Sequence, residues 1–318
     1  MAEKIEEMST REAYGLKLAE LGAENKNIVV LDADLSGSTC TAYFAKKFPD
    51  RFFNVGIAEQ NMIGIAAGLA ASGKIAVAST FAIFASGRAF DQIRTSVCYA
   101  NLNVKIGASH AGLATGEDGP SHHATEDIAL MRVIPNMKVI CPADKTEAMQ
   151  ATECMINSKG PFYLRLCRAK TPVYFGKNYE FKLGKGTIAE EGKDVTIIAT
   201  GKILFEALKA REELKKEKID ACVIDMASIK PIDEKLIVQK AKETGLIITA
   251  EDHQVNCGLG GAVCEVLSEN NPCRVVRIGI QDKFTESATG DDLYKKYGLS
   301  YNWIVDSIKE ELKNRKLQ

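Results

Sequence analysis

The sequence predicts an α/β protein made of two doubly wound domains, and three observations support this fold class. Short apolar runs alternate with segments of helical period, as in β-α-β units with parallel strands. The 318 residues suffice for about two domains of ordinary size. The alternation weakens over 171–193, where Pro172, glycines and mixed charges interrupt it, and then restarts. We therefore expect a first domain over 1–170, a linker over 171–193 and a second domain over 194–318.

The elements of the first domain begin with a helix. Ser9-Thr10-Arg11-Glu12 has the form of a capping box, and Leu16, Leu18 and Leu21 supply the apolar side of the helix that follows. Further helices are expected over about 59–71, 86–99 and 145–155. Apolar runs predict strands over 28–31, 75–79, 104–108, 138–140 and 162–164.

The second domain repeats the alternation. Strands are expected over 195–198, 221–224, 246–248 and 274–278, with a charged helix over 203–217 and a final amphipathic helix over 301–313. A stretch over 61–87 carries Lys74 as its only charge, which raises the question of a membrane span. Its Gly/Ala/Ser composition and the turn at 72–74 favour a buried helix followed by a buried strand.

Charge and cysteine content limit the class of partner. The chain has 41 Lys and Arg against 42 Asp and Glu, so no basic excess predicts a nucleic acid as its main partner. Its 9 cysteines are scattered without CxxC spacing, which favours a reducing compartment over a metal site. The charged residues 1–11 do not resemble a signal peptide. We expect a cytoplasmic protein that does not bind membranes.

The most unusual segment is the histidine loop, His110–His123, which directly follows a predicted strand. It reads HAGLATGEDGPSHH and holds three of the 4 histidines of the chain. Glycines let a loop wrap a small polar ligand, and histidines and acids there can bind hydroxyls or phosphate. A solvated loop without function is the less favoured alternative, and a zinc site is weak because no Cys accompanies the histidines.

Three other segments lie where ligands bind in parallel sheets, near the carboxyl ends of strands. Glu59 begins an otherwise apolar helix, where a desolvated carboxyl would retain a proton near neutrality or else only favour the helix dipole. Phe81 and Phe84 are spaced to form a wall for an aromatic ring, although core packing is the default for such a pair. Asp34 and Ser38 follow a strand and either face a ligand or form a turn and cap. The glycine-rich run 257–261 lacks the third Gly of a dinucleotide fingerprint and is expected to shape a helix start.

Three motifs, taken in order, resemble the transketolase family. They are FNVGIAEQ (53–60), STFAIF (79–84) and GEDGPSH (116–122), and the last is the most specific. The resemblance covers essentially the whole chain and corresponds to the C-terminal half of a transketolase, its pyrimidine-binding domain plus its C-terminal domain. It implies transfer of a two-carbon ketol unit from a ketose phosphate to an aldose phosphate, with thiamine diphosphate and magnesium as cofactors.

For the cofactor, the resemblance implies roles at four positions. Glu59 matches the catalytic glutamate, which hydrogen-bonds a ring nitrogen of the aminopyrimidine and so promotes formation of the thiazolium carbanion. Phe81 and Phe84 match aromatic residues that stack against the pyrimidine, which overrides the core default. Asp34 matches an acid beside the cofactor.

For the substrate, the resemblance implies two groups of residues. Asp118 and His122 match residues that contact hydroxyls of the donor sugar. The substrate-phosphate site is matched by Arg11, Ser38, His110 and Arg168, a set chemically suited to an anion. Arg165 lies close to Arg168 in the sequence and is the alternative cation for this position.

The sequence departs from the full-length family at several positions. Gly87 replaces a frequent third aromatic, Ala111 replaces an acid, and His123-Ala124 replaces Gln-Pro. No Gly-Asp-Gly motif for magnesium and diphosphate occurs in the chain. The resemblance to split transketolases implies a separate N-terminal subunit that carries this motif and most of the magnesium site, in an assembly such as two of each chain.

Three alternatives remain open. The β subunit of the thiamine component of a 2-oxoacid dehydrogenase has a similar layout, but its substrate lacks the phosphate that the anion site and GEDGPSH loop suggest. A deoxyxylulose-phosphate synthase-like part has a similar loop that usually lacks this sequence. A non-catalytic assembly subunit would not require the glutamate, aromatics and histidines together.

Overall fold

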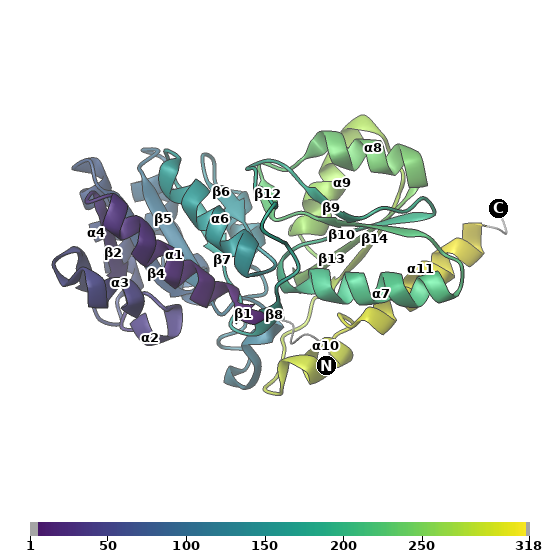
Figure 1. Ribbon diagram of the computed structural model, residues 1–318, viewed down its shortest axis with the longest axis horizontal. Coiled ribbons are helices and arrows are strands. Elements are labelled where there is room, and N and C mark those ends of the chain that lie inside the picture. The colour runs from purple at the N-terminus through teal and green to yellow at the C-terminus, as the bar shows by residue number, and fades with distance from the viewer. Residues whose placement is uncertain (1–5, 316–318) are drawn as a thin grey trace.

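The computed structural model describes residues 6–315 and places two α/β units side by side along the longest axis of the molecule (Figure 1). The first unit contains the predicted site residues, and the second contributes the green and yellow half of the ribbon. Both contain predominantly parallel sheets with helices on their two faces. The predicted fold class is therefore confirmed.

The first unit is built on a seven-stranded sheet of order β12-β6-β7-β5-β4-β2-β3. Its strands are β2 (Ile28–Asp32), β3 (Phe52–Asn54), β4 (Ile75–Phe81), β5 (Val104–Ser109), β6 (Lys138–Ile140), β7 (Phe162–Arg165) and β12 (Ser228–Lys230). All neighbouring pairs except β12–β6 are parallel. The carboxyl ends of β2, β4 and β5 therefore meet at one edge of the sheet, as the apolar runs predicted.

Helices cover both faces of this sheet. One face is packed by α1 (Thr10–Glu24), α3 (Ala42–Lys47) and α6 (Lys145–Asn157), and the other by α4 (Glu59–Ala71), η2 (Phe84–Arg88), η3 (Gln92–Cys98) and α5 (Asp127–Arg132). Ser9 of the predicted capping box is the N-cap of α1, because its hydroxyl accepts a hydrogen bond from the Glu12 amide at 3.4 Å. The helix expected over 86–99 forms with wide π-type turns in η2 and η3.

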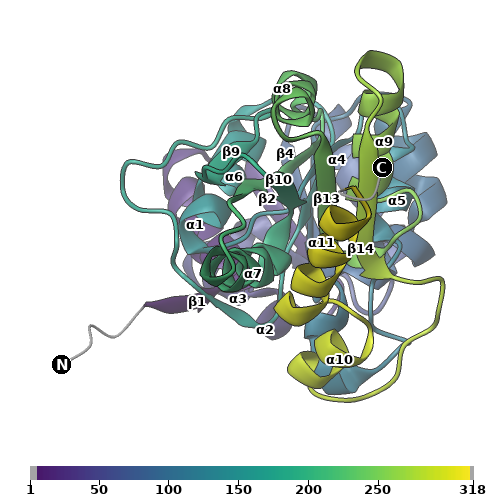
Figure 2. The same cartoon turned by 90° about the vertical axis from the view of Figure 1, so that its right-hand side faces the viewer.

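The second unit has a five-stranded sheet of order β14-β13-β10-β11-β9. Its strands are β9 (Thr187–Glu190), β10 (Val195–Ala199), β11 (Ala221–Asp225), β13 (Leu246–Gln254) and β14 (Arg274–Ile280). One face is packed by α7 (Leu204–Lys216), α10 (Gly290–Lys296) and α11 (Tyr301–Arg315), and the other by α8 (Glu234–Thr244) and α9 (Leu259–Asn270). Figure 2 shows α11, α9 and β14 in front of the first unit.

The chain crosses between the two units more than once. After β11 it returns to the first sheet, where β12 pairs antiparallel with β6 and Ile229 is buried in the first unit's core. β1 (Glu7–Ser9) pairs with β8 (Lys170–Pro172) in a separate two-stranded sheet. β9 lies inside the segment 171–193 expected as a linker and joins the second sheet. The division at 170 and 193 stays a prediction.

Candidate functional site

Strand register brings the candidate residues to one sheet edge. Asp32 at the end of β2 aligns with Asn54 on β3 and Ser79 on β4, and Phe81 at the end of β4 aligns with Ser109 on β5. Residues directly after these positions therefore lie side by side beyond the same edge. Ligands bind there in open parallel sheets.

Glu59 lies at the first position of α4 and is almost completely buried. The Thr80 hydroxyl donates to its Oε1 at 3.5 Å, and Arg88 Nη1 lies 2.8 Å from its Oε2. The expectation of an isolated carboxyl among apolar side chains was therefore incomplete, because a guanidinium that is 47% exposed reaches it from η2. Arg88 is a site residue that the sequence reasoning missed.

The aromatic pair lies beside this carboxyl. The rings of Phe81 and Phe84 are nearly parallel, at 15° with centroids 5.8 Å apart, and straddle the end of β4. Phe81 also stacks on His110 at 3.8 Å, while the Arg88 guanidinium lies 4.4 Å from the centre of Phe84. Arg88 thus contacts both the carboxylate and the half-buried aromatic ring.

Arg11, Ser38 and His110 come together from three elements. Arg11 Nη1 donates to the Ser38 carbonyl at 2.6 Å and lies 3.5 Å from His110 Nε2. The Ser109 hydroxyl lies 2.9 Å from the other ring nitrogen of His110. Arg11 Nε is buried without a hydrogen-bond partner. The cluster therefore has donor capacity for an anion.

His110 is held neutral in this position. Burial, which is the largest cause, the positive charges of Arg11 and Arg168, and the nearby His122 together lower its pKa to about 3. A neutral imidazole can accept a hydrogen bond from Arg11 and still donate one from its second nitrogen.

This pKa predicts how stability depends on pH. The folded pKa of His110 lies below the ordinary value near 6.5, so the unfolded chain binds more protons between these values and stability falls as the pH drops below 6.5. Between pH 7.5 and pH 5, we expect the unfolding free energy of His110→Gln to fall by roughly 2 kcal/mol less than that of the wild type. Urea denaturation at both pH values measures it, and parallel losses in the two proteins would contradict it.

The histidine loop contacts Arg168 and the aromatic pair. Arg168 Nη1 donates to the Thr115 carbonyl at 2.6 Å and lies 3.4 Å from Asp118. The His122 ring meets Phe84 edge-on at 5.4 Å. Arg165, by contrast, is buried in an ion pair with Asp127 at 2.9 Å. Arg168 rather than Arg165 therefore faces the candidate site.

Asp34 lies at the sheet edge but does not cap the turn that follows β2. It has a positive φ of 63°, is exposed, and accepts a hydrogen bond from Asn54 at 2.8 Å. Asp32 binds that turn instead, accepting from the Leu35 amide and the Thr39 hydroxyl. Of the two roles considered for Asp34, the capping role therefore belongs to Asp32 instead.

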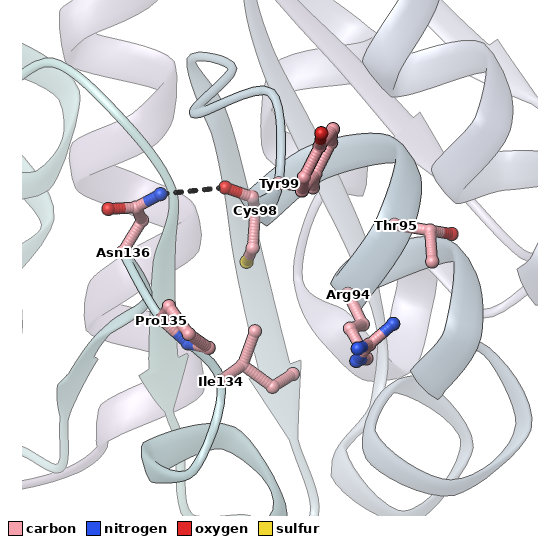
Figure 3. Close-up of a pocket in the computed structure, with 7 residues that line it drawn as sticks. All are labelled: Arg94, Thr95, Cys98, Tyr99, Ile134, Pro135 and Asn136. Atoms are coloured by element: carbon pink, nitrogen blue, oxygen red, sulfur yellow. Dashed lines mark hydrogen bonds between the residues drawn. The ribbon is translucent and has the colours of Figure 1, made fainter.

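Two further features lie outside this cluster. The glycine-rich run 257–261 starts α9, whose first amides at Leu259 and Gly260 donate to the buried Glu251 carboxylate at 2.7 and 2.9 Å. The helix-start interpretation of this run is therefore confirmed. A hollow of about 420 Å³ contains none of the predicted site residues (Figure 3) and is lined by Arg94, Thr95, Cys98, Tyr99, Ile134, Pro135 and Asn136.

Within residues 6–315, no three His, Cys, Asp or Glu side chains are grouped as ligands for a metal ion. In this described range, no helix has both the length and the apolar character needed to cross a bilayer.

Comparison with known proteins identifies both halves of the chain. Residues 6–173 match the family model of the transketolase pyrimidine-binding domain, and residues 184–304 match that of the transketolase C-terminal domain. A protein of Methanocaldococcus jannaschii, named as a transketolase C-terminal section, is 52% identical over 95% of this chain and 96% of its own length. A 6-deoxy-6-sulfo-D-fructose transketolase subunit of a Clostridium species is 42% identical over 96% of this chain and 95% of its own length.

Solved structures and full-length enzymes agree with this. A structure described as a split-gene transketolase in an inactive β4 tetramer superposes with a TM-score of 0.90 and 53% identity, over 96% of this chain and 99% of that one. The transketolase of Rattus norvegicus is 40% identical over 96% of this chain, which spans only 49% of that protein. The chain therefore belongs to the transketolase family and comprises its pyrimidine-binding and C-terminal domains.

Proposed function

We propose that this chain is the C-terminal subunit of a split transketolase and supplies the pyrimidine-binding half of a thiamine diphosphate site. The arrangement of Glu59, Phe84 and Arg88 carries the proposal. The buried Glu59 carboxylate and the face of the Phe84 ring both contact the guanidinium of Arg88, a planar hydrogen-bonding group that is half exposed. An aminopyrimidine ring has the same needs, a hydrogen-bond acceptor at its edge and an aromatic surface at its face.

The residues present fit one end of the cofactor. Glu59 would hold the aminopyrimidine edge, Phe81 and Phe84 would stack against its face, and Asp34 at the same sheet edge would lie beside it. Thiamine diphosphate, when bound, supplies a carbanion nucleophile that takes up the two-carbon unit. Arg88 must leave Glu59 for that ring to bind, and its side chain is 47% exposed, so water can solvate the guanidinium once it has moved.

The diphosphate end is not matched within the described residues, and this supports a partner subunit. The sequence lacks Gly-Asp-Gly, and no metal-ligand group occurs over residues 6–315. The surface formed by the segment before Glu59 includes two exposed apolar side chains, Ile57 at 79% and Phe53 at 43%. An N-terminal subunit that covers this surface would complete the site and hold magnesium, in an assembly with two copies of each chain.

The substrate side is proposed to bind a sugar phosphate. Arg11, Ser38, His110 and Arg168 form the anion site, and Asp118 and His122 face the sugar hydroxyls. Support comes from the Nε of Arg11, which is buried and has no hydrogen-bond partner among the described residues, so the guanidinium keeps a donor for an anionic oxygen. The guanidiniums of Arg11 and Arg168 would orient the phosphate, and Glu59 would bind only the cofactor.

Relatives differ in the sugar they use. One is named as a subunit for 6-deoxy-6-sulfo-D-fructose and another as a subunit for apulose 4-phosphate. Both names describe a sugar that carries an anionic group, which agrees with the donor chemistry of the proposed anion site. We assign this chain to ketose and aldose phosphates in the cytoplasm, as in the pentose phosphate pathway. No observation favours the 2-oxoacid dehydrogenase, synthase-like or assembly-subunit alternatives.

Reconstitution tests this proposal. We expect the chain mixed with an N-terminal transketolase subunit to transfer ketol units from xylulose 5-phosphate to ribose 5-phosphate, with a requirement for thiamine diphosphate and magnesium. Neither chain alone should turn over, because each holds half of the site. Activity with pyruvate but not with xylulose 5-phosphate, or full activity of this chain by itself, would overturn it.

A further inference from the structure

The second unit contacts the histidine loop through the end of β13. Asp252 is 4% exposed, and its Oδ1 and Oδ2 accept hydrogen bonds from the amides of Leu113 at 2.8 Å and Ala114 at 3.3 Å. These are the first amides of η4 (Leu113–Asp118), the helical turn that ends at Asp118. A carboxylate from one domain therefore caps the turn that carries a proposed substrate residue of the other.

Tyr294 on α10 fixes this carboxylate from behind. Its hydroxyl donates to Asp252 Oδ2 at 2.8 Å, and burial raises the pKa of Tyr294, so the hydroxyl keeps its proton. The carboxylate thus has a charge-assisted donor on the second-unit side in addition to the two amides of η4. Its orientation is determined before any ligand binds.

The loop is shaped to admit these contacts. Gly112 has a φ of 71°, and a Cβ there would lie 2.2 Å from Asp252 Oδ2. At the other end of η4, a Cβ on Gly119 would lie 2.3 Å from Ser287 Oγ. Both glycines of the HAGLATGEDG segment that flank η4 therefore permit close approach of the second unit.

His123, at the end of the histidine loop, forms hydrogen bonds to both units. Its Nδ1 lies 2.7 Å from Thr285 Oγ1 in the second unit, and its Nε2 lies 2.8 Å from the Gly116 carbonyl in η4. This histidine is buried, unlike the half-buried His122 beside it. The position where the sequence departs from its family is thus occupied by a side chain that bridges the two domains.

We propose that Asp252 is a positioning residue, and that the second domain acts in the reaction by holding η4 so that Asp118 and His122 face the donor sugar. The substrate role of Asp118 and His122 rests on the proposed function. The hydrogen bonds from the first amides of η4 to Asp252 do not depend on it. Asp252 contacts the backbone of the loop rather than Asp118 or His122, so it acts through them.

Glu251 provides a matched control. It is also buried, and its carboxylate also accepts two backbone amides, but both belong to α9 within the second unit. Glu251→Gln and Asp252→Asn therefore remove the same charge from adjacent buried positions that each accept two backbone amides. Only Asp252→Asn alters a contact to the histidine loop.

The first measurement is amide hydrogen exchange in the full chain, which needs no activity. We expect Asp252→Asn to raise exchange of the Leu113 and Ala114 amides by about tenfold or more, because an Asn amide group replaces one of two acceptor oxygens. Tyr294→Phe, which keeps the carboxylate, should give a smaller increase and serves if Asp252→Asn does not fold. Glu251→Gln should leave this exchange unchanged.

The second measurement is steady-state transfer by the reconstituted complex. Asp252→Asn is expected to raise the KM for the ketose phosphate donor about tenfold while changing thermal stability no more than Glu251→Gln does. Wild-type exchange at Leu113 and Ala114, or equal effects of the two variants on exchange and KM, would overturn the inference. If the wild-type complex transfers no ketol units, the proposed function fails while the exchange result still decides whether Asp252 holds η4.

Discussion

Glu59→Ala is expected to lower kcat of the reconstituted complex by about a thousandfold or more while the chain stays folded. A proton-transfer group in the reacting position contributes on the order of 10² to 10⁴ in rate, and Glu59 is the buried carboxylate at the proposed pyrimidine edge. The fold should tolerate the change, because the partner left behind is the half-exposed Arg88, which water can solvate.

Two measurements separate loss of chemistry from loss of structure. Circular dichroism and thermal unfolding of Glu59→Ala should match the wild type within a few degrees. Gln60→Ala changes the next position of α4, whose exposed side chain donates to the Arg88 carbonyl at 3.1 Å, and should keep most of the activity. Turnover of Glu59→Ala at the wild-type rate would refute the assignment of this carboxylate.

The largest effect on stability is expected for Asp127→Ala. Asp127 is fully buried, and its carboxylate accepts from Arg165 Nε at 2.9 Å and from the Tyr163 hydroxyl at 2.8 Å. Arg165 also donates to the carbonyls of Ala124 and Asp252, so it cannot leave for solvent. Removal of one partner of a buried pair leaves an uncompensated charge and costs about 3–5 kcal/mol.

A surface ion pair supplies the control for this prediction. Glu213 and Lys216 pair on the exposed side of α7, and Glu213→Ala should change the free energy of unfolding by less than about 0.5 kcal/mol. Urea denaturation at pH 7.5 compares both variants with the wild type. A loss below about 1 kcal/mol for Asp127→Ala would show that Arg165 finds another counter-charge or water.

Much of the fold followed from local patterns in the sequence. The helix over 59–71 and the strand over 75–79 form where their small and apolar side chains pack into one core, and the strand continues to Phe81. β12 was not predicted, because three residues of mixed character carry no periodic signal, and their pairing partner on β6 lies about 90 residues earlier in the chain. Strand pairing at that distance is decided by packing rather than by propensity.

The site was predictable where its residues follow strands of the first sheet. Ser38 and His110 approach each other because β2 and β5 end at the same sheet edge, which the alternating pattern implies, and Arg11 reaches both from α1. Arg88 was missed because its contact with Glu59 spans 29 residues and depends on wide π-type turns, for which FASGR gives no clear signal. Asp32 rather than Asp34 caps the turn after β2, because only the backbone at Asp34 adopts a positive φ and turns its side chain outward.

The return of β12 to the first sheet has a consequence for how the chain can be divided. A cut within 171–193 would separate two sequence domains but would leave β6 as an open edge in one fragment and Ile229 exposed in the other. We expect the open edge and the exposed Ile229 to lower the solubility of both fragments, so the two halves are not expected to act as independent modules. We therefore expect the two domains of this chain to unfold together, because β12 of the later segment completes the sheet of the first domain.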